Sequence, residues 1–296
     1  MSKRHPIVAV TGSSGAGTTY MRRAFEHIFR HQAIRPAIIE GDCFHKYNRT
    51  EMQEAMEKAE VEERGPTHFG PEGNLFEALE ALFMRYALDG TGNRRYYVHN
   101  EEQAALYHQQ PGTFTPWEPL PKDTDLLFYE GLHGALVTDK VNVIRHVALS
   151  IGVVPIINLE WIQKIHRDKR VRGYSAEWAT HMILNRMRDY VYYIIPQFSR
   201  TDINFQRVPT VDVSNPFAAE EIPGDDESFV VIHVRNMKKL QVDFRYLVEV
   251  VDGAFMSRPD TVVIPAVKKI LAIELIITPV IEHLLEEKRQ AEFVAD

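Results

Sequence analysis

Short runs of apolar residues alternate along the chain with longer stretches that are apolar on one side only. Residues 7–10 form a β-branched run that predicts a buried strand, and a glycine-rich turn follows over residues 12–19. From residue 19 to about residue 30, apolar side chains recur at helical spacing, and residues 37–40 read as a second buried strand. The N-terminal region therefore predicts a β-α-β unit with parallel strands.

The same alternation continues to the C-terminus and favours an α/β fold with a mostly parallel sheet. Helices are predicted over residues 50–63, 75–88, 158–172, 177–190 and 271–289. Further strands are predicted over residues 96–99, 126–131, 151–155, 229–234 and 262–264, and a loop over residues 111–121. No repeat, flexible linker or shift of composition marks a boundary, so we expect residues 1–296 to form a single domain.

Composition excludes several classes of protein. Hydrophobic residues make up 45% of the 296 residues, which argues against long disordered stretches. Cys43 is the only cysteine, so no disulfide can form within the chain, and the longest apolar stretch, Ile151–Leu159, is far shorter than the about 18 residues of a spanning helix. The start of the chain resembles no signal peptide, so we expect a cytoplasmic protein that has no membrane partner. A net charge of −7 argues against general nucleic-acid binding.

The glycine-rich turn fits most of the P-loop pattern, in which backbone N–H groups surround phosphate oxygens. Its residues are Gly12, Ser13, Ser14, Gly15, Ala16, Gly17, Thr18 and Thr19. Thr18 stands where the pattern has lysine, and Thr19 supplies the hydroxyl expected on Mg²⁺. The alternative is a plain strand-turn-helix connection that needs glycine only for its geometry. Because the turn follows a strand and opens a helix, we interpret it as a nucleotide phosphate site.

Two acids follow predicted strands, at the edge where parallel sheets bind ligands. Asp42 comes after residues 37–40 and is a candidate general base, although a helix cap or turn aspartate is an equal alternative. Glu130 closes the strand over residues 126–131, in the position of an acid that holds a metal directly or through water. We expect nearby His133 to be structural, since Mg²⁺ prefers oxygen ligands.

A basic segment precedes Gly173. On a helix, Lys164, Asp168 and Arg172 share one face with Arg167 beside them, which places three cations around one acid. A basic lid of this kind could supply the positive charge that Thr18 lacks. The alternative is a solvated charged face with internal ion pairs.

A second polar group surrounds Asp42 in the sequence. Arg49, with His45 nearby, is placed to bind an anionic part of the acceptor, and His99 is a candidate for the same ligand. As a lone histidine, His99 has a structural alternative, a hydrogen-bonded strand end.

Several long blocks in order resemble the bacterial phosphoribulokinases. They are residues 12–19, 40–45, 128–134, 158–168, 201–209 and 212–217, and the resemblance extends from about residue 6 to residue 279. It implies a P-loop nucleoside-triphosphate-hydrolase-like α/β fold with a mostly parallel sheet, flanking helices and a basic lid. It also implies that threonine in the lysine position of the P-loop is usual for this bacterial class.

The resemblance implies an activity and roles for single residues. The family uses ATP with Mg²⁺ to phosphorylate O1 of D-ribulose 5-phosphate, giving ribulose 1,5-bisphosphate for the Calvin cycle. By resemblance, Asp42 is the catalytic base and Glu130 the second acid near the metal. The remaining roles concern ribulose 5-phosphate binding, by His45, Arg49 and His99, and the lid, formed by Lys164, Arg167, Asp168 and Arg172.

Two departures from the family concern regulation. Cys43 alone cannot form the regulatory disulfide of plant and cyanobacterial members. Bacterial members are often homo-oligomers that respond to NADH and AMP through arginines. We expect a homo-oligomer here too, but the aligned positions hold His31, Asn185 and His233, while Arg186 and Arg258 remain, which argues against a response to NADH.

Two other functions remain open from the sequence. One is a related kinase acting on uridine or another small alcohol, and the other is a nucleotide-binding regulatory protein without turnover. A GTPase switch is disfavoured, because the chain lacks an Asn-Lys-x-Asp motif for reading the base.

Overall fold

The computed structural model describes residues 2–13, 17–60, 65–173 and 175–293, without the side chains of Thr19, Glu60, Val171 and Arg172. Its strands are β1 (Ile7–Thr11), β2 (Pro36–Glu40), β3 (Asn93–Arg94), β4 (Glu118–Pro119), β5 (Leu126–Gly131), β6 (Leu149–Val154), β7 (Ile203–Pro209), β8 (Ser228–Val234), β9 (Phe255–Arg258) and β10 (Thr261–Pro265). Its α-helices are α1 (Thr18–His31), α2 (Arg49–Glu60), α3 (Phe76–Asp89), α4 (Glu101–Tyr107), α5 (Ile157–Arg172), α6 (Ala176–Asn185), α7 (Met187–Asp189), α8 (Met237–Leu240), α9 (Phe244–Val250) and α10 (Lys269–Phe293).

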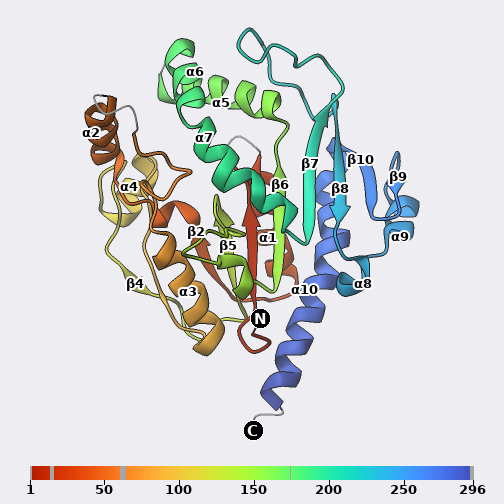
Figure 1. Cartoon of the computed structure of the whole chain (residues 1–296). Coiled ribbons are helices and arrows are strands. Elements are labelled where there is room, and N and C mark those ends of the chain that lie inside the picture. The colour runs from red at the N-terminus through yellow and green to blue at the C-terminus, as the bar shows by residue number, and fades with distance from the viewer. Residues whose placement is uncertain (1, 14–16, 61–64, 174, 294–296) are drawn as a thin grey trace.

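Within these described residues, eight strands form one sheet in the order β2-β5-β1-β6-β7-β8-β10-β9. The five strands β2, β5, β1, β6 and β7 are parallel, and β8, β10 and β9 extend the sheet by antiparallel pairing. The predicted mostly parallel α/β sheet is confirmed. Figure 1 shows α5 and α6 across the end of the sheet where the parallel strands finish, with the antiparallel strands at the opposite side from α2 and α4.

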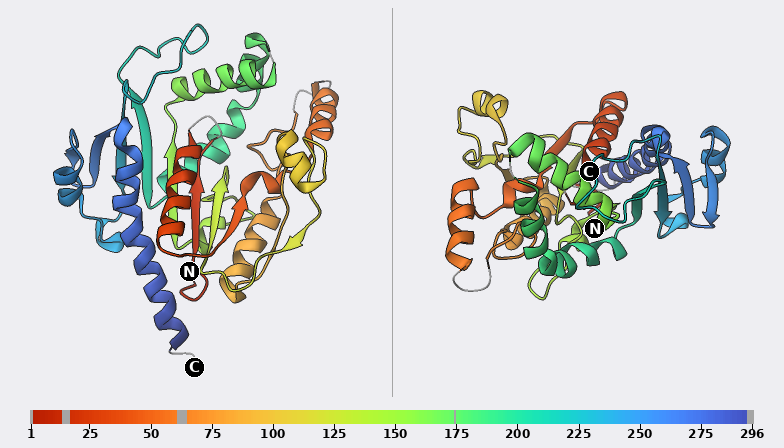
Figure 2. Two further views of the ribbon diagram at one scale, coloured as in Figure 1. Left: turned by 180° about the vertical axis from the view of Figure 1, so that it is seen from behind. Right: turned by 90° about the horizontal axis from the view of Figure 1, so that it is seen from above.

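Two hydrophobic cores cover the two faces of the sheet. Side chains of β1 alternate between them: Val8 and Val10 join the core under α1 and α10, while Ile7 and Ala9 join the core under α3. This alternation follows from the two-residue period of a strand and explains why a central strand is apolar at every position. The view from behind shows α1 and α10 side by side on one face (Figure 2).

The structure corrects several predicted elements. The helix predicted over residues 177–190 is divided into α6 and α7, followed by a π-helical turn over Tyr190–Ile194. The strand predicted over residues 96–99 is only an isolated bridge between Tyr97 and Phe114, and the loop over residues 111–121 contains the two-residue strand β4. Strand β7 was not predicted, and α2 ends at Glu60, beyond which residues 61–64 lie outside the described part.

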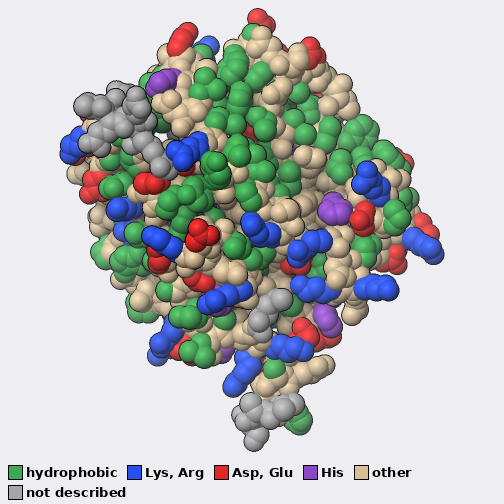
Figure 3. Space-filling view, viewed as in Figure 1, with side chains coloured by type: hydrophobic (Ala, Val, Ile, Leu, Met, Phe, Trp, Pro, Cys, Tyr) green, Lys and Arg blue, Asp and Glu red, His purple; other side chains and the backbone are tan. Residues whose placement is uncertain are grey.

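Charged side chains of both signs are interspersed over the lower half of the face in Figure 3, while apolar and uncharged side chains dominate its upper part. No helix of the described residues has the length and apolar composition that crossing a bilayer requires.

Candidate functional site

The carboxyl-terminal ends of three neighbouring strands bring the predicted site together. β5 lies between β1 and β2, with Glu130 opposite Val10 on one side and Glu40 on the other. The turn after β1 begins with a hydrogen bond from Gly12 N to Gly131 O of 3.1 Å. The start of the P-loop at Gly12, Asp42 and Glu130 therefore lie at the same end of the parallel strands, as the sequence predicts.

Two glycines allow the ends of β2 and β5 to meet closely. A Cβ on Gly131 would lie 2.6 Å from Gly41 Cα, and a Cβ on Gly41 would lie 2.6 Å from the hydroxyl of Tyr129. Such distances are shorter than any van der Waals contact, so a side chain at either position would force the strands apart. The spacing between the backbone at Asp42 and that at Glu130 is thus set by direct contact of two main chains.

The P-loop leads into α1 through Gly17, whose φ of 88° favours glycine. Ser14, Gly15 and Ala16 lie outside the described residues, as does the side chain of Thr19. The structure therefore places the two ends of the predicted phosphate cradle, on the last residues of β1 and the first turn of α1.

Glu160 is a functional candidate that the sequence reasoning missed. The Ser13 hydroxyl donates to its carboxylate, and the hydroxyl of Tyr190 donates to the other oxygen at 2.7 Å. Burial raises the pKa of Glu160, whereas these two hydrogen bonds and the charge of Arg186 act in the opposite direction. The sequence does contain a sign of this role, because Glu160 is an acid surrounded by apolar residues in the segment Leu159–Ile162. Through Glu160, the first turn of α5 is fastened to the P-loop.

Thr18, in the lysine position of the P-loop, contacts the acid predicted near the metal. Burial raises the pKa of Glu130, its hydrogen bond with Thr18 lowers it, and the charge of Asp42 raises it further. A divalent cation would relieve this crowding of negative charge, so the carboxylate of Glu130 fits a metal ligand. Within the described residues no cluster of three His, Cys, Asp or Glu side chains forms a site by itself.

Asp42 lies in a short 3₁₀ turn, η1 (Gly41–Phe44), directly after β2, with its side chain 39% exposed. His45 Nε2 lies 3.2 Å from one carboxylate oxygen and His99 Nε2 lies 3.5 Å from the other. Burial raises the pKa of Asp42, but the charge and hydrogen bond of His45 and the charges of His99 and His68 outweigh it and hold the pKa below the usual range. Asp42 is therefore an ionised carboxylate within reach of solvent.

His45 is itself enclosed by residues that the sequence did not indicate. It is 6% exposed, its ring lies 4.4 Å from the ring of His68, and its Nδ1 lies 2.8 Å from Asn74 Oδ1. Burial lowers the pKa of His45, and the charge and hydrogen bond of Asp42, with the hydrogen bond of Asn74, raise it above its ordinary value. His68 and Asn74 come from the loop before α3, where no local pattern distinguishes them.

Arg49 opens α2 beside the same cluster. Its backbone N–H donates to Gly112 O at 2.8 Å, and its guanidinium donates to His99 O at 3.2 Å. The structure thus brings His45 and His99 to the two carboxylate oxygens of Asp42 and binds Arg49 to the backbone of His99.

Arg95 binds the turn that carries Asp42 and His45. Its guanidinium donates to the carbonyls of Cys43 and His45 at 2.8 and 2.7 Å and stacks on Phe114 at 3.6 Å from the ring centroid. These bonds hold the backbone on both sides of Phe44, and no sequence motif marks Arg95.

The predicted lid residues lie on α5, and two of them are buried. Lys164 is 8% exposed and donates to Asp168, which is fully buried, while Arg167 Nε lies 3.5 Å from the other oxygen of Asp168. The alternative, a solvated charged face with internal ion pairs, is confirmed for the ion pair of Lys164 with Asp168 and wrong for the exposure of these two side chains. The side chain of Arg172 lies outside the described residues.

His133 and Cys43 have structural surroundings. His133 is 4% exposed and its Nε2 lies 3.0 Å from the carbonyl of Phe69, which confirms the expectation that it is structural. Burial lowers its pKa to about 3 and raises the pKa of the Cys43 thiol to about 12.

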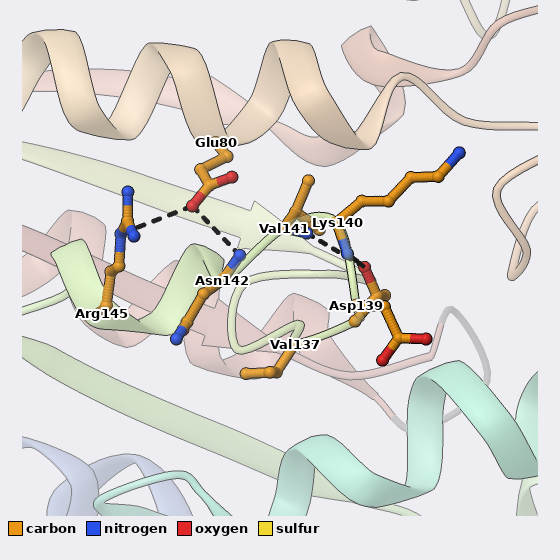
Figure 4. A pocket seen from close by; sticks show the side chains of 8 residues that line it. Glu80, Val137, Asp139, Lys140, Val141, Asn142 and Arg145 are labelled. Carbon is orange, nitrogen blue, oxygen red and sulfur yellow. Dashed lines mark hydrogen bonds and ion pairs between the residues drawn. The ribbon is translucent and has the colours of Figure 1, made fainter.

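A surface hollow of about 280 Å³ lies away from these residues, between α3 and the loop over residues 137–145. Figure 4 shows the carboxylate of Glu80 between Arg145 and Asn142 at its wall. Glu80 accepts from Asn142 N at 3.0 Å and lies 3.5 Å from Arg145 Nε. The hollow contains none of the predicted site residues.

A family model, curated relatives and a solved structure all indicate the same protein family. A model of the "Phosphoribulokinase / Uridine kinase family" matches residues 7–214. The chain is 57% identical to the chromosomal phosphoribulokinase of Cupriavidus necator, over 98% of this chain and 99% of that one, and 56% identical to the phosphoribulokinase of Nitrobacter vulgaris, over 98% and 100%. A solved phosphoribulokinase structure from Rhodobacter spheroides superposes with a TM-score of 0.89 at 46% identity, covering 97% of this chain and all of that one. The chain belongs to the phosphoribulokinase / uridine kinase family.

Proposed function

We propose that this protein is an ATP-dependent phosphoribulokinase that phosphorylates O1 of D-ribulose 5-phosphate to give ribulose 1,5-bisphosphate for the Calvin cycle. The observation that carries this proposal is the ionised carboxylate of Asp42, partly exposed beside His45 and His99, on the sheet edge that also holds the P-loop and Glu130. Full-length relatives named phosphoribulokinase support the choice of acceptor.

Asp42 is the proposed general base. Its carboxylate accepts the proton of the acceptor hydroxyl as that oxygen bonds to the γ-phosphorus of ATP and the bond from this phosphorus to the leaving ADP breaks, a contribution of about 10²–10⁴ in rate. Phosphoryl transfer otherwise depends on positioning and on charge stabilisation. We assign binding of the sugar phosphate to His45, Arg49 and His99; the contacts of His45 and His99 with Asp42 and of Arg49 with His99 O support this assignment.

The nucleotide side of the site is proposed to consist of the P-loop and the lid. Backbone N–H groups of Gly12, Ser13, Ser14, Gly15, Ala16, Gly17, Thr18 and Thr19 surround the phosphates, and Lys164, Arg167 and Arg172 supply positive charge with Asp168 among them. Glu130 and Thr19 are the proposed ligands of Mg²⁺, which neutralises charge on the phosphate oxygens when bound. The fastening of α5 to the P-loop through Glu160 supports one nucleotide site built from both.

We propose that residues 1–296 act as a single kinase domain. One eight-stranded sheet includes both β1 and β10, and α10 packs against α1. Residues of β1 and α1 and residues of β8, β10 and α10 belong to the same one of the two hydrophobic cores, which supports a single domain.

The test is ADP release from ATP and Mg²⁺ with different acceptors. We expect turnover with ribulose 5-phosphate and none above background with uridine, with the phosphorylated product identified by mass spectrometry. Preferential turnover of uridine would indicate the related kinase, and tight ATP binding without ADP release for any acceptor would indicate a regulatory protein. Repeating the assay with NADH and AMP tests the regulatory expectation.

A further inference from the structure

Asn74 holds His45 on the side opposite Asp42. Asn74 is 5% exposed and lies in the segment that leads into α3. Backbone hydrogen bonds from Lys46 N to Gly73 O and from Leu75 N to Phe44 O, both between 2.8 and 2.9 Å, fasten this segment to the turn that carries His45. The position of the Asn74 amide relative to the imidazole is thus fixed by main-chain pairing.

The hydrogen bonds of Asn74 define which way its amide faces. Its Nδ2 donates to the carbonyl oxygens of His68 and Gly70, at 2.9 and 2.7 Å. Both amide hydrogens are therefore used, and the reversed amide would set Oδ1 against two carbonyl oxygens. Oδ1 consequently faces His45 Nδ1 at 2.8 Å as an acceptor, so Nδ1 must carry a hydrogen.

This donor role determines the protonation state of His45. A neutral imidazole carries one N–H, and Asn74 places it on Nδ1. Nε2, which lies 3.2 Å from Asp42 Oδ1, would then present a lone pair to a carboxylate. The contact is attractive only when Nε2 also carries a hydrogen, which makes His45 an imidazolium.

The other groups around His45 divide into two sets. The charge of Asp42 favours the imidazolium, and the charge of Arg95 opposes it. The ring of His68 lies 4.4 Å away, the buried His133 is near enough to interact electrostatically, and His99 faces the far oxygen of Asp42. Asn74 is thus the uncharged group that supports the charged form of His45 by direct hydrogen bonding.

We propose that Asn74 is a positioning residue that keeps His45 as the charged partner of Asp42, so that Asp42 stays ionised until it accepts the hydroxyl proton. The proposal rests on the proposed function only for its effect on catalysis. Without the Asn74 acceptor, a neutral His45 can move its hydrogen to Nε2 and still donate to Asp42, but it no longer contributes a positive charge.

The proposal predicts opposite effects for two substitutions. In Asn74→Leu the hydrogen-bond acceptor of His45 Nδ1 is lost. The pH at which the His45 imidazolium becomes neutral therefore falls by about one to two units. In Asn74→Asp a carboxylate faces Nδ1, so that pH rises. Loss of packing or of the bonds to His68 and Gly70 is shared by both variants and cannot produce shifts of opposite sign.

The measurement is the pH titration of His45 by NMR on the ¹⁵N-histidine-labelled full chain, assigned with His45→Gln. A second readout is the pH profile of kcat/KM for ribulose 5-phosphate, whose alkaline limb we expect to move down for Asn74→Leu and up for Asn74→Asp. The NMR titration needs no turnover, so it tests the inference even if ribulose 5-phosphate is not the acceptor.

Asn204 on β7 provides a matched control. Its Nδ2 donates to Phe198 O at 2.8 Å and its Oδ1 accepts from Thr201 Oγ1 at 2.6 Å, on a strand separated from β2 by three others. We expect Asn204→Leu to lower Tm without moving the His45 titration. An unchanged titration in folded Asn74→Leu, or shifts of the same sign in both Asn74 variants, would overturn the proposal. If Asn74→Leu fails to fold, a downward or absent shift in Asn74→Asp overturns it.

Discussion

The acids on the two sides of the site differ in what surrounds them. On the acceptor side, formed by Asp42, His45, His68, Asn74 and His99, the carboxylate of Asp42 is 39% exposed and faces imidazoles. On the nucleotide side, formed by the P-loop and α5, Glu160 and Asp168 are 7% and 0% exposed and bind other side chains of the protein. The difference teaches that exposure separates the acid proposed to meet the substrate, Asp42, from two acids whose side chains hold other parts of the protein together.

Removing the reactive acid should give the largest effect on rate. We expect Asp42→Asn to lower kcat by at least about 10²-fold with ATP affinity unchanged, because an amide cannot accept the hydroxyl proton. Steady-state kinetics measure kcat, and equilibrium binding measures the affinity for ATP. Asp243→Asn is the control, since Asp243 caps α9 through Arg245 N and Tyr246 N on the antiparallel side and should leave kcat unchanged. Near-normal turnover in folded Asp42→Asn would remove Asp42 from its role.

Removing a buried acid of the nucleotide side should act first on stability. Asp168→Asn leaves the charge of buried Lys164 without its carboxylate partner, so we expect a loss of about 3 kcal/mol in the free energy of unfolding, measured in urea. Asp89→Asn breaks a pair of the same i,i+4 spacing with exposed Arg85 and should change stability far less. Equal losses in both variants would contradict the structural role of Asp168.

Substitution of Arg49 tests whether the acceptor side binds the phosphate group of the substrate. We expect Arg49→Ala to raise KM for ribulose 5-phosphate about tenfold, since one charge-assisted hydrogen bond is lost, with KM for ATP unchanged. Initial rates with each substrate varied in turn measure both constants. Lys122→Ala, at an exposed position on the loop before β5, serves as a control for loss of positive charge. An effect confined to ATP would refute the assignment.

His133 gives a smaller effect that appears only in acid. Burial lowers its pKa to about 3, so the unfolded chain binds a proton below about pH 6.5 that the folded chain does not. The free energy of unfolding should therefore fall by about 1.4 kcal/mol per pH unit between pH 6 and pH 4 from this group. His133→Gln should lack that part of the slope, as measured by unfolding at several pH values. At pH 8 the imidazole is neutral in both states, so a difference there reports packing and the contact with Phe69 O rather than protonation.

The elements that the sequence predicted best are those whose apolar residues follow a single pattern, either a continuous run or helical spacing. The β1–α1 connection combines a continuous apolar run with helical spacing and was predicted almost to the residue. β7 was missed because Asn204 and Gln206 alternate with the buried Ile203 and Phe205, so the strand lacks the continuous apolar run by which β1 was predicted.

The candidate site was predictable only where a residue follows a strand or belongs to a motif. Asp42 and Glu130 met that condition through their place at strand ends. Asn74, His68 and Arg95 did not, because loops bring them to His45 by tertiary pairing that leaves no local spacing in the chain.

The contact between Gly41 and Gly131 has a consequence for redesign of this enzyme. Because bare main chains meet there, the spacing of the backbone between Asp42, the proposed base, and Glu130, the proposed metal ligand, is set apart from the side chains of His45, Asn74 and His99. Exchanging the loops that supply these side chains, to accommodate a different alcohol, therefore leaves this backbone spacing unchanged, whereas the new loops must again supply a charged partner for Asp42. A library that varies the loops but leaves both glycines untouched is the natural starting point for changing acceptor preference.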